Sequence, residues 1–548
     1  MELRNRDFSG EPVVLEVEDL MIGLPSGTPV LGSVSFNIRK GETLCLVGES
    51  GSGKSVTSLT VMGLLPKGAL LVKSGAIKLD GTDLLKLSVA EMKKMRATRV
   101  SMIFQEPMTA LNPVIRVGEQ ITEVLDVHTN LSAAEKRAKV INIMEQVHLP
   151  DVERIYQSYP HQLSGGQRQR IMIAMALILE PAVLIADEPT TALDVTTQKQ
   201  ILALIAELQE KHGTAVLFIT HDMGVVAEIA DRVCVMRSGE IVEYGTIRDV
   251  LTNPQQQYTK DLLASVPSLN PREAREEVTS EAVIKVRDLG MTYKVGGLFR
   301  MKAGTRASRD VSFDLQPGKT LGIVGESGSG KTTVARSIMR LIEPTEGEII
   351  IDGRNIAHLG RREMKPFRQK LQVVFQDPFR SLNPRWTIEQ SLTEGPLNYG
   401  VPYDEAVREA KRLLKIVSLP EDSLKRYPHQ FSGGQRQRIA IARAVALRPD
   451  ILVADEAVSA LDVSVQAQVL DLLAELQKET GIAIIFITHD LRVAAQICDE
   501  VLVMQRGQVV EQGKAADVLG RPSHEYTRSL IEAAPGRFWD FAAGRPAA

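Results

Sequence analysis

Short runs of apolar residues recur along the chain, and each is followed by glycine or by small polar residues. Residues 42–47 and 320–324 form two such runs and lead into glycine-rich segments, after which helices are predicted to begin near Lys54 and Lys331. Strands buried on both faces of a parallel sheet are apolar along their whole length, and four further runs have this character: residues 182–186, 215–219, 450–454 and 483–487. The pattern predicts α/β domains with parallel central strands.

The chain contains the same sequence twice. Residues 48–55 read GESGSGKS and residues 325–332 read GESGSGKT, while residues 160–170 read PHQLSGGQRQR and residues 428–438 read PHQFSGGQRQR. Further elements follow in the same order in both halves. An internal repeat of this length predicts two similar domains.

The spacing of the repeats predicts the domain boundaries. We expect a first domain at residues 12–264, a linker at 265–282, a second domain at 283–534 and a loose tail at 535–548, because the linker is polar and contains prolines. The offset between the copies is 269 upstream of the glycine-rich loops (293 − 24), 277 at the loop lysines (331 − 54) and 268 at the serines of the SGGQ segments (432 − 164). The second copy therefore has about eight extra residues before its glycine-rich loop, and we interpret the basic stretch 294–309 as a surface loop.

Composition excludes several classes of protein. A net charge of −3 lacks the basic surplus of a protein that coats nucleic acid, so no nucleic-acid partner is expected. The three cysteines, Cys45, Cys234 and Cys498, have no paired spacing that indicates a zinc site or disulfides. The longest apolar run of helical character, residues 171–179, is too short to span a bilayer, and the charged start does not resemble a signal peptide. Work at a membrane would therefore require partner subunits.

Each glycine-rich octet has the composition of a loop that binds nucleotide phosphates. A loop between a strand and a helix offers backbone N–H donors and the positive end of a helix dipole, and its lysine reaches the β- and γ-phosphates. The hydroxyl after the lysine is a ligand for Mg²⁺. The predicted nucleotide-binding residues are Gly48, Glu49, Ser50, Gly51, Ser52, Gly53, Lys54 and Ser55 in the first loop and Gly325, Glu326, Ser327, Gly328, Ser329, Gly330, Lys331 and Thr332 in the second, with Ser55 and Thr332 also as metal ligands.

Phosphoryl transfer also needs a carboxylate for Mg²⁺ and a group that orients or deprotonates the attacking water. An Asp-Glu pair ends one apolar run in each half, which alone would more simply be an acidic turn. Because a phosphate loop precedes it in both halves, we predict Asp187 and Asp455 as metal ligands and Glu188 and Glu456 as catalytic residues.

A histidine and a glutamine follow other apolar runs in each half. His221 and His489, both in the sequence FITHD, are predicted catalytic residues that stabilise charge at the γ-phosphate, although a single histidine of this kind would more often be structural. Gln105 and Gln376 are predicted to contact Mg²⁺ or water through a neutral amide.

The SGGQ segments provide a second helix start that is suited to an anion, since two glycines precede a helix. No anion of their own half is available to them, so we expect each to bind the nucleotide of the other half. The residues are Ser164, Gly165, Gly166 and Gln167 in the first half and Ser432, Gly433, Gly434 and Gln435 in the second.

This ordered set of motifs resembles the ATP-binding cassette (ABC) transporter ATPases, with both nucleotide-binding domains in one chain. The resemblance implies P-loop NTPase cassettes of α/β class, each with a RecA-like core, an antiparallel β sub-domain and a helical sub-domain that meets a transmembrane permease. It also implies that ATP and Mg²⁺ are held between the phosphate loop of one half and the SGGQ segment of the other, which is the signature of the family.

Residues 105–113 (QEPMTALNP) and 376–384 (QDPFRSLNP), with the Tyr-Thr segments 257–260 and 525–528, are similar to the peptide/nickel group of bacterial ABC importers. These ATPases drive uptake of di- and oligopeptides, glutathione, nickel or peptide-like antibiotics such as microcin C. The resemblance implies two permease subunits and a solute-binding protein as partners, and a peripheral place at the cytoplasmic face of the bacterial inner membrane.

The sequence departs from the family pattern in three respects. The family's adenine-stacking aromatic corresponds to Tyr293 in the second half but to Leu24 in the first, so the first site is expected to bind nucleotide more weakly. Pro189 follows the first catalytic glutamate, whereas Ala457 follows the second. The iron–sulfur extension of some peptide-importer ATPases is not expected with three scattered cysteines.

One alternative is a soluble twin-cassette ATPase that acts on ribosomes or DNA. Such proteins carry a long charged arm, zinc-binding cysteines or inserted coiled coils, and this sequence has a short linker with none of these. Another alternative, a regulatory cassette without turnover, is opposed by the presence of Glu188 and Glu456.

Overall fold

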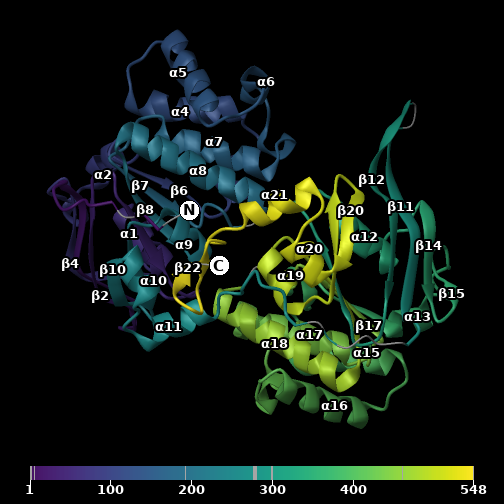
Figure 1. Ribbon diagram of the computed structural model, residues 1–548. Helices are drawn as coiled ribbons and strands as arrows, with labels where there is room; N and C mark the ends of the chain where they lie inside the picture. Colours follow the sequence, from purple (N-terminus) through teal and green to yellow (C-terminus); the bar gives the residue numbers. More distant parts are fainter. Residues whose placement is uncertain are drawn as a thin grey trace. The chain divides into compact units, whose positions relative to one another are not determined.

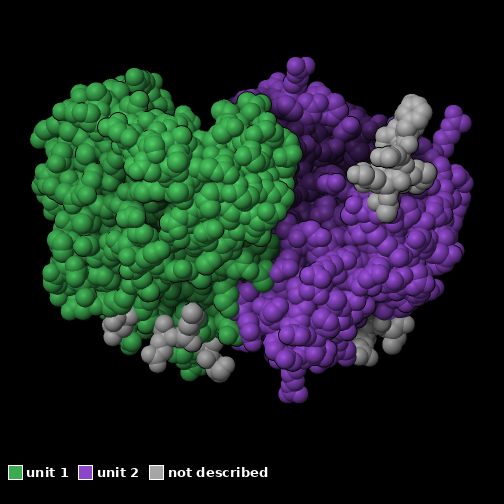
Figure 2. All heavy atoms as spheres, turned by 90° about the horizontal axis from the view of Figure 1, so that it is seen from above, with its two compact units in different colours: residues 1–266, 535–548 green, residues 267–534 purple. Residues whose placement is uncertain are grey.

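The structure, a computed structural model, describes residues 3–4, 6–191, 193–273, 275, 280–297, 300–459 and 461–546. The chain divides into unit 1, residues 1–266 with 535–548, and unit 2, residues 267–534, which Figure 2 shows in two colours. Each unit contains one copy of the repeat.

The central sheet of unit 1 is built from the predicted apolar runs. Its six strands have the order β10-β9-β3-β8-β7-β6, in which β3, β6, β7, β8 and β9 are parallel and β10 is antiparallel to β9. All residues of β3, β7 and β8 are buried, which explains why these strands are continuously apolar. The strands are β3 (Thr43–Val47), β6 (Val100–Ile103), β7 (Val183–Asp187), β8 (Ala215–Thr220), β9 (Arg232–Arg237) and β10 (Glu240–Thr246).

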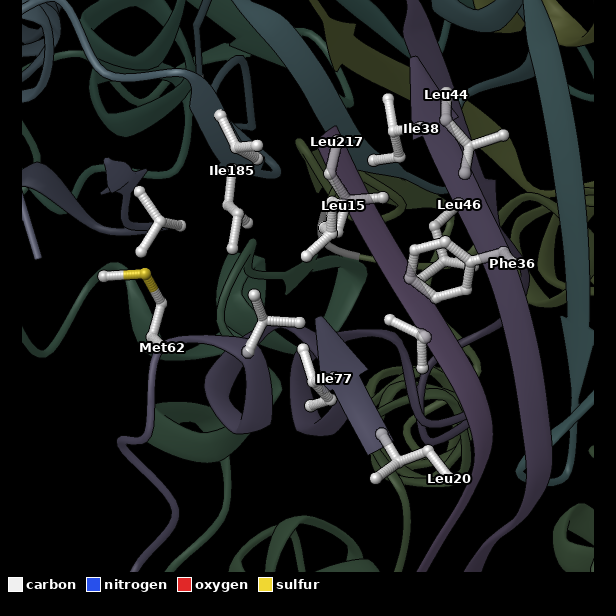
Figure 3. Close-up of a cluster of buried hydrophobic side chains, with 14 of the residues drawn as sticks. Leu15, Leu20, Phe36, Ile38, Leu44, Leu46, Met62, Ile77, Ile185 and Leu217 are labelled. Carbon is white, nitrogen blue, oxygen red and sulfur yellow. The ribbon is translucent and has the colours of Figure 1, made fainter. Parts of the chain in front are cut away.

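A second, antiparallel sheet of unit 1 has the order β2-β1-β4-β5. Its strands are β1 (Val13–Gly23), β2 (Pro29–Arg39), β4 (Leu71–Leu79) and β5 (Thr82–Asp83). Figure 3 shows side chains of this sheet, among them Leu15 and Ile38, packed against Leu46, Ile185 and Leu217 of the central sheet. The resulting core fixes the central sheet, whose strand ends carry the site.

Helices fill the connections of unit 1. Between β6 and β7 the chain forms a mainly helical region, and Figure 1 shows α4, α5 and α6 gathered at one end of the unit beside α7. The helices are α1 (Lys54–Val61), α2 (Val89–Met95), α3 (Pro107–Ala110), α4 (Val117–His128), α5 (Ala133–Gln146), α6 (Val152–Tyr156), α7 (Gly165–Leu177), α8 (Val195–His212), α9 (Met223–Ile229), α10 (Ile247–Thr252) and α11 (Gln257–Ala264), with 3-10 turns at Leu84–Lys86 and Pro160–Gln162.

Unit 2 repeats this architecture, with sheets in the orders β16-β17-β18-β13-β19-β20 and β12-β11-β14-β15. Its strands are β11 (Ile284–Gly297), β12 (Arg300–Leu315), β13 (Thr320–Val324), β14 (Glu346–Ile351), β15 (Arg354–Asn355), β16 (Leu371–Val374), β17 (Ile451–Asp455), β18 (Ala483–Thr488), β19 (Glu500–Gln505) and β20 (Gln508–Lys514). Its helices are α12 (Lys331–Ile338), α13 (Lys365–Lys370), α14 (Pro378–Ser381), α15 (Ile388–Asn398), α16 (Tyr403–Ile416), α17 (Gly433–Val445), α18 (Val463–Thr480), α19 (Leu491–Ile497), α20 (Ala515–Gly520) and α21 (Glu525–Ala533), with 3-10 turns at Glu421–Lys425 and Pro428–Gln430. The predicted α/β class with two tandem cassettes is confirmed.

The extra residues of the second copy differ from the surface loop that the sequence suggested. Strands β11 and β12 continue through this stretch as an antiparallel pair, in which Val295 is opposite Lys302 and Gly297 is opposite Arg300. Backbone pairing extends a hairpin even where glycine and lysine weaken the alternation of side chains. Residues 298 and 299 lie outside the described residues.

The C-terminal segment also differs from the loose tail that the sequence suggested, because its contacts place it in unit 1. The N–H of Gly536 donates to Glu228 Oε1 on α9 at 3.0 Å. Trp539 and Phe541 are buried, and a short strand pair joins β21 (Trp539–Asp540) to β22 (Arg545–Pro546). Burial of the two aromatic side chains stabilises the packing of this segment. The sequence did not predict this packing, because the segment has neither helical nor strand periodicity.

In each unit, an arginine from the segment that precedes the cassette contacts an aspartate at the same position of the repeat. Arg6 donates two hydrogen bonds to Asp231, at 3.0 and 2.8 Å. In unit 2 the linker residue Arg272 lies 2.7 Å from Asp499, and its N–H donates to a backbone oxygen of α19. This part of the predicted linker is therefore packed on unit 2, while residues 274 and 276–279 lie outside the described residues.

Among the residues that the structure describes, no helix combines the length and the apolar character needed to cross a bilayer.

Candidate functional site

The first phosphate loop connects β3 to α1, and its glycines are required by close contacts. Gly48 has φ 151° and a Cβ there would lie 2.2 Å from the carbonyl oxygen of Met236. Gly53 has φ 106° and a Cβ there would lie 2.3 Å from Leu31. Both positions therefore exclude other residues, and the loop turns tightly so that α1 starts at Lys54.

The loop lysines lie folded along the backbone of their own loops. Lys54 Nζ donates to the carbonyl oxygens of Gly48 and Glu49, at 2.6 and 2.8 Å. Lys331 Nζ donates to the equivalent oxygens of Gly325 and Glu326, both at 2.7 Å. Each ammonium group is thus buried at the mouth of a helix start, where it adds positive charge for a phosphate.

The aspartates at the ends of β7 and β17 are buried carboxylates suited to a divalent cation. Asp187 accepts hydrogen bonds from Ser55 Oγ at 3.3 Å and from Ser58 Oγ at 3.5 Å. Burial, followed by the charge of the neighbouring glutamate, raises the pKa of Asp187 and likewise of Asp455. The Oδ1 atom of Asp455 is buried and accepts no hydrogen bond from the described residues.

A cation would remove this electrostatic cost, since Mg²⁺ prefers hard oxygen ligands. The carboxylate and hydroxyl pairs, Asp187 with Ser55 and Asp455 with Thr332, supply such oxygens. The donor set therefore fits Mg²⁺.

The two glutamates predicted to be catalytic adopt a left-handed backbone conformation. Glu188 has φ 45° and Glu456 has φ 50°, a region that is costly for a residue with a side chain. Each N–H donates to the last but one residue of the neighbouring strand, Ile219 at 2.9 Å and Ile487 at 3.0 Å. The glutamate backbone is thus held by the sheet itself. Because the two φ values agree, Pro189 is not needed for this geometry, and Ala457 leaves the turn unchanged.

The Glu188 carboxylate lies at the centre of a hydrogen-bonded network. Its Oε2 accepts from Gln105 Nε2 at 2.8 Å and from Thr191 Oγ1 at 3.0 Å, and its Oε1 lies 3.1 Å from His221 Nδ1. Burial alone would raise the pKa of Glu188, but the hydrogen bond and charge of His221 outweigh burial and lower the pKa to about 2. Glu188 is therefore ionised at neutral pH and can accept a proton from water.

Unit 2 has a similar network that differs at the hydroxyl residue. Glu456 Oε2 accepts from Gln376 Nε2 at 2.8 Å, and Oε1 lies 3.5 Å from His489 Nδ1. Ser459, at the position of Thr191, donates to the backbone oxygen of Glu456 at 3.0 Å and accepts from Gln376 Nε2 at 3.4 Å. Burial would lower the pKa of His489, but the hydrogen bond and charge of Glu456 raise it. The same contact lowers the pKa of Glu456 in spite of its burial.

The signature residues form the starts of α7 and α17. Ser164 Oγ accepts from the N–H of Gln167 at 3.2 Å, and Gln167 Oε1 accepts from the N–H of Ser164 at 3.0 Å. Ser432 and Gln435 make the same reciprocal pair. This arrangement is a capping box, which fixes the first turn of the helix.

The structure thus brings together, within each unit, the predicted lysine, hydroxyl, aspartate, glutamate, glutamine and histidine. Sequence reasoning did not assign the hydroxyl groups of Ser58 and Thr191. The spacing could have predicted them, since Ser58 lies three residues after Ser55 on a helix and Thr191 lies three residues after Glu188 in a turn.

The predicted adenine position is occupied differently in the two units. Tyr293 lies on β11 with 39% of its surface exposed, and Leu24 directly follows β1 with 38% exposed. Both side chains are therefore similarly exposed, but Tyr293 is paired with Thr305 within the hairpin, whereas Leu24 lies at the turn between β1 and β2.

Comparison with known proteins identifies the family of the chain. Residues 31–191 and 308–459 match the ABC transporter family, and residues 242–291 and 510–537 match the oligopeptide/dipeptide transporter C-terminal region.

Among curated relatives, the glutathione import ATP-binding protein GsiA of Escherichia coli O157:H7 is 48% identical, over 95% of this chain and 89% of that protein. The same protein of Escherichia coli strain K12 is 47% identical over the same shares. A solved dimeric ATP-binding cassette bound to ADP and phosphate is 33% identical over 42% of this chain and 98% of its own, with a TM-score of 0.39.

The curated relatives and the family matches support the importer prediction, and they give no support to the ribosome or DNA alternative. The chain belongs to the ABC transporter family as an ATPase with two ATP-binding cassettes, each followed by the C-terminal region of oligopeptide/dipeptide transporters.

Proposed function

We propose that the chain is the ATP-hydrolysing subunit of a bacterial ABC importer for peptides or peptide-like solutes, with glutathione and di- or oligopeptides as the first candidates. The observation that carries the proposal is that a hydrogen-bonded carboxylate, Glu188 in unit 1 and Glu456 in unit 2, follows a central strand in each half of a chain related over most of its length to glutathione import ATPases. Nickel and microcin C-like peptides are further candidates from the same group of importers.

In hydrolysis, Glu188 and Glu456 would accept a proton from the attacking water, because both carboxylates are held ionised and fixed by their neighbours. His221 and His489 would stabilise charge at the γ-phosphate through Nε2 while Nδ1 stays with the glutamate. Gln105 and Gln376 hold the glutamate side chain in place.

The phosphates would be bound by Lys54 and by the N–H groups of the first loop, and by Lys331 and the second loop in unit 2. Mg²⁺, when bound, would be held by the oxygens of Ser55, Gln105 and Asp187, and by the equivalent residues Thr332, Gln376 and Asp455, and would neutralise phosphate charge.

We further propose that each ATP is completed by the signature of the other unit, so that the two sites form head to tail. Two features support this proposal. The capping boxes fix Ser164 and Ser432 at rigid helix starts, and such starts attract anions. Gly165, Gly166, Gly433 and Gly434 leave the backbone of these starts accessible.

The partners that this function requires are two transmembrane permease subunits and, through them, an extracytoplasmic solute-binding protein. The chain would then lie peripherally at the cytoplasmic face of the bacterial inner membrane. The helical regions after Gln105 and Gln376 are the candidate contacts with the permease.

Affinity purification of the full chain from detergent-solubilised membranes tests this proposal. We expect two permease subunits to copurify, and ATP hydrolysis by the reconstituted complex to rise when its binding protein carries the imported solute. A matched chain with both Lys54→Ala and Lys331→Ala should retain the permeases but show no stimulation. Recovery of ribosomes in place of permeases would refute the importer function.

A further inference from the structure

A tyrosine from the last helix of the first cassette contacts the back of the phosphate loop. Tyr258, on α11, accepts a hydrogen bond from the backbone N–H of Glu49 at 3.3 Å. In the second cassette Tyr526, on α21, accepts from the N–H of Glu326 at 3.1 Å. Both contacts join residues about 200 positions apart in the sequence, so they are set by the fold and not by local structure.

The loop residue that the tyrosine contacts is the one that also holds the loop lysine. The carbonyl oxygen of Glu49 accepts from Lys54 Nζ at 2.8 Å, and that of Glu326 accepts from Lys331 Nζ at 2.7 Å. A single residue therefore lies between the tyrosine hydroxyl and the phosphate-binding ammonium group. Movement of this residue would move the ammonium group.

The helix that carries each tyrosine is fixed to the central sheet. On β10, Glu243 accepts from the N–H groups of Gln255 and Gln256, at 2.7 and 3.2 Å, just before α11 begins. On β20, Glu511 accepts from Ser523 and His524 at the same two distances. A carboxylate at a helix start is favourable, and here it anchors the helix.

The turn before each of these strands holds the other side of the loop. The N–H of Gly239 donates to the carbonyl oxygen of Ser52 at 2.9 Å, and the N–H of Gly507 donates to that of Ser329 at 2.9 Å. The C-terminal part of each cassette thus contacts its phosphate loop at two points.

The two tyrosines differ in how they are themselves held. The guanidinium of Arg237 lies 4.9 Å from the ring centre of Tyr258, a cation–π contact. The equivalent position of unit 2 (237 + 268 = 505) is Gln505, and there Tyr526 is buried, with 7% of its surface exposed.

We propose that Tyr258 and Tyr526 are positioning residues of the phosphate loops, through which the C-terminal region of each cassette sets the affinity for ATP. The proposal rests on ATP binding by the loops and not on which solute is imported. Because neither tyrosine contacts a reacting atom, its hydroxyl should affect the KM for ATP and leave kcat unchanged.

The test removes one hydroxyl from the full-length chain while a single loop remains able to bind. In the Lys54→Ala background, only the second loop retains its lysine, and Tyr526→Phe should weaken ATP binding about fivefold, the worth of one such hydrogen bond. In the Lys331→Ala background the same change should leave ATP affinity unaltered, whereas Tyr258→Phe should weaken it. Affinity is measured by calorimetric titration with MgATP, and KM and kcat by phosphate release.

Tyr244→Phe is the matched control, because Tyr244 lies on β10 of the same region and its ring faces Arg232; it should leave ATP affinity unchanged. Equal weakening by Tyr526→Phe in both backgrounds would mean that the hydroxyl supports the whole chain and would overturn the proposal. Unchanged affinity in both backgrounds, or a fall in kcat at constant KM, would overturn it as well. Failure to copurify permeases would refute the importer function but would leave these affinities as they are.

Discussion

The difference between Leu24 and Tyr293 predicts unequal ATP sites. Both side chains are about two-fifths exposed, and they are corresponding positions of the repeat (293 − 269 = 24). A ring stacked on a base contributes ~1 to 3 kcal/mol, which is about 5- to 150-fold in affinity. Since leucine still offers an apolar contact to adenine, we expect the lower end, about fivefold weaker binding at the first site.

The measurement compares two full-length variants by MgATP titration. In Lys331→Ala only the first loop keeps its lysine, and in Lys54→Ala only the second does, so each titration reports mainly on one site. Adding Leu24→Tyr to the first variant should strengthen binding about fivefold, and adding Tyr293→Leu to the second should weaken it by a similar factor.

The matched substitutions separate stacking from a general effect on the chain. Equal affinities in the two lysine variants would contradict the reasoning. An unchanged affinity after Leu24→Tyr would show that adenine does not rest at this position.

Three further predictions follow from the geometry. Because the folded pKa of His489 is raised above 6.5, its pairing with Glu456 stabilises the fold fully below pH 6.5, and this stabilisation is lost as pH rises through the folded pKa. The difference in free energy of unfolding between the unchanged chain and His489→Gln, measured by urea denaturation, should therefore fall over that range. A difference that stays constant with pH would contradict this prediction. Gly434→Ala should lower the free energy of unfolding by ~1 to 3 kcal/mol, because its Cβ would lie 2.3 Å from a valine side chain of α18, whereas Gly433→Ala, with open space around its Cβ, should not; equal effects would refute the steric reason. Phe541→Ala should expose residues 535–548 to limited proteolysis, since the ring is buried in unit 1, and an unchanged cleavage rate would contradict its anchoring role.

Much of the fold follows from the sequence because the chemistry of the site constrains it locally. Strands such as β3 and β7 are buried on both faces, so a continuous apolar run in the sequence predicts each of them. The glycine-rich loop or the carboxylate that follows the run predicts where the strand ends. The sequence places Asp187 just after a strand, and the structure makes it the last strand residue. The networks around the glutamates were therefore foreseeable as sets of residues.

What the sequence could not show are contacts that depend on distant segments. Tyr258 lies on an ordinary polar helix, and only the fold brings it to Glu49. The segment with Trp539 and Phe541 has no periodicity, so its packing in unit 1 depends on α9, about 300 residues earlier. The hairpin extension through Val295 depends on pairing with β12, which glycine and lysine do not signal.

The central claim is that this chain hydrolyses ATP at two sites built around Glu188 and Glu456. Changing both glutamates to glutamine preserves their shape but removes the proton acceptors. We predict that ATP hydrolysis falls about 100-fold or more, the usual contribution of a general base, while MgATP affinity is retained. Hydrolysis that persists within a few-fold of the unchanged chain would contradict the claim, because the proton acceptor would then lie elsewhere.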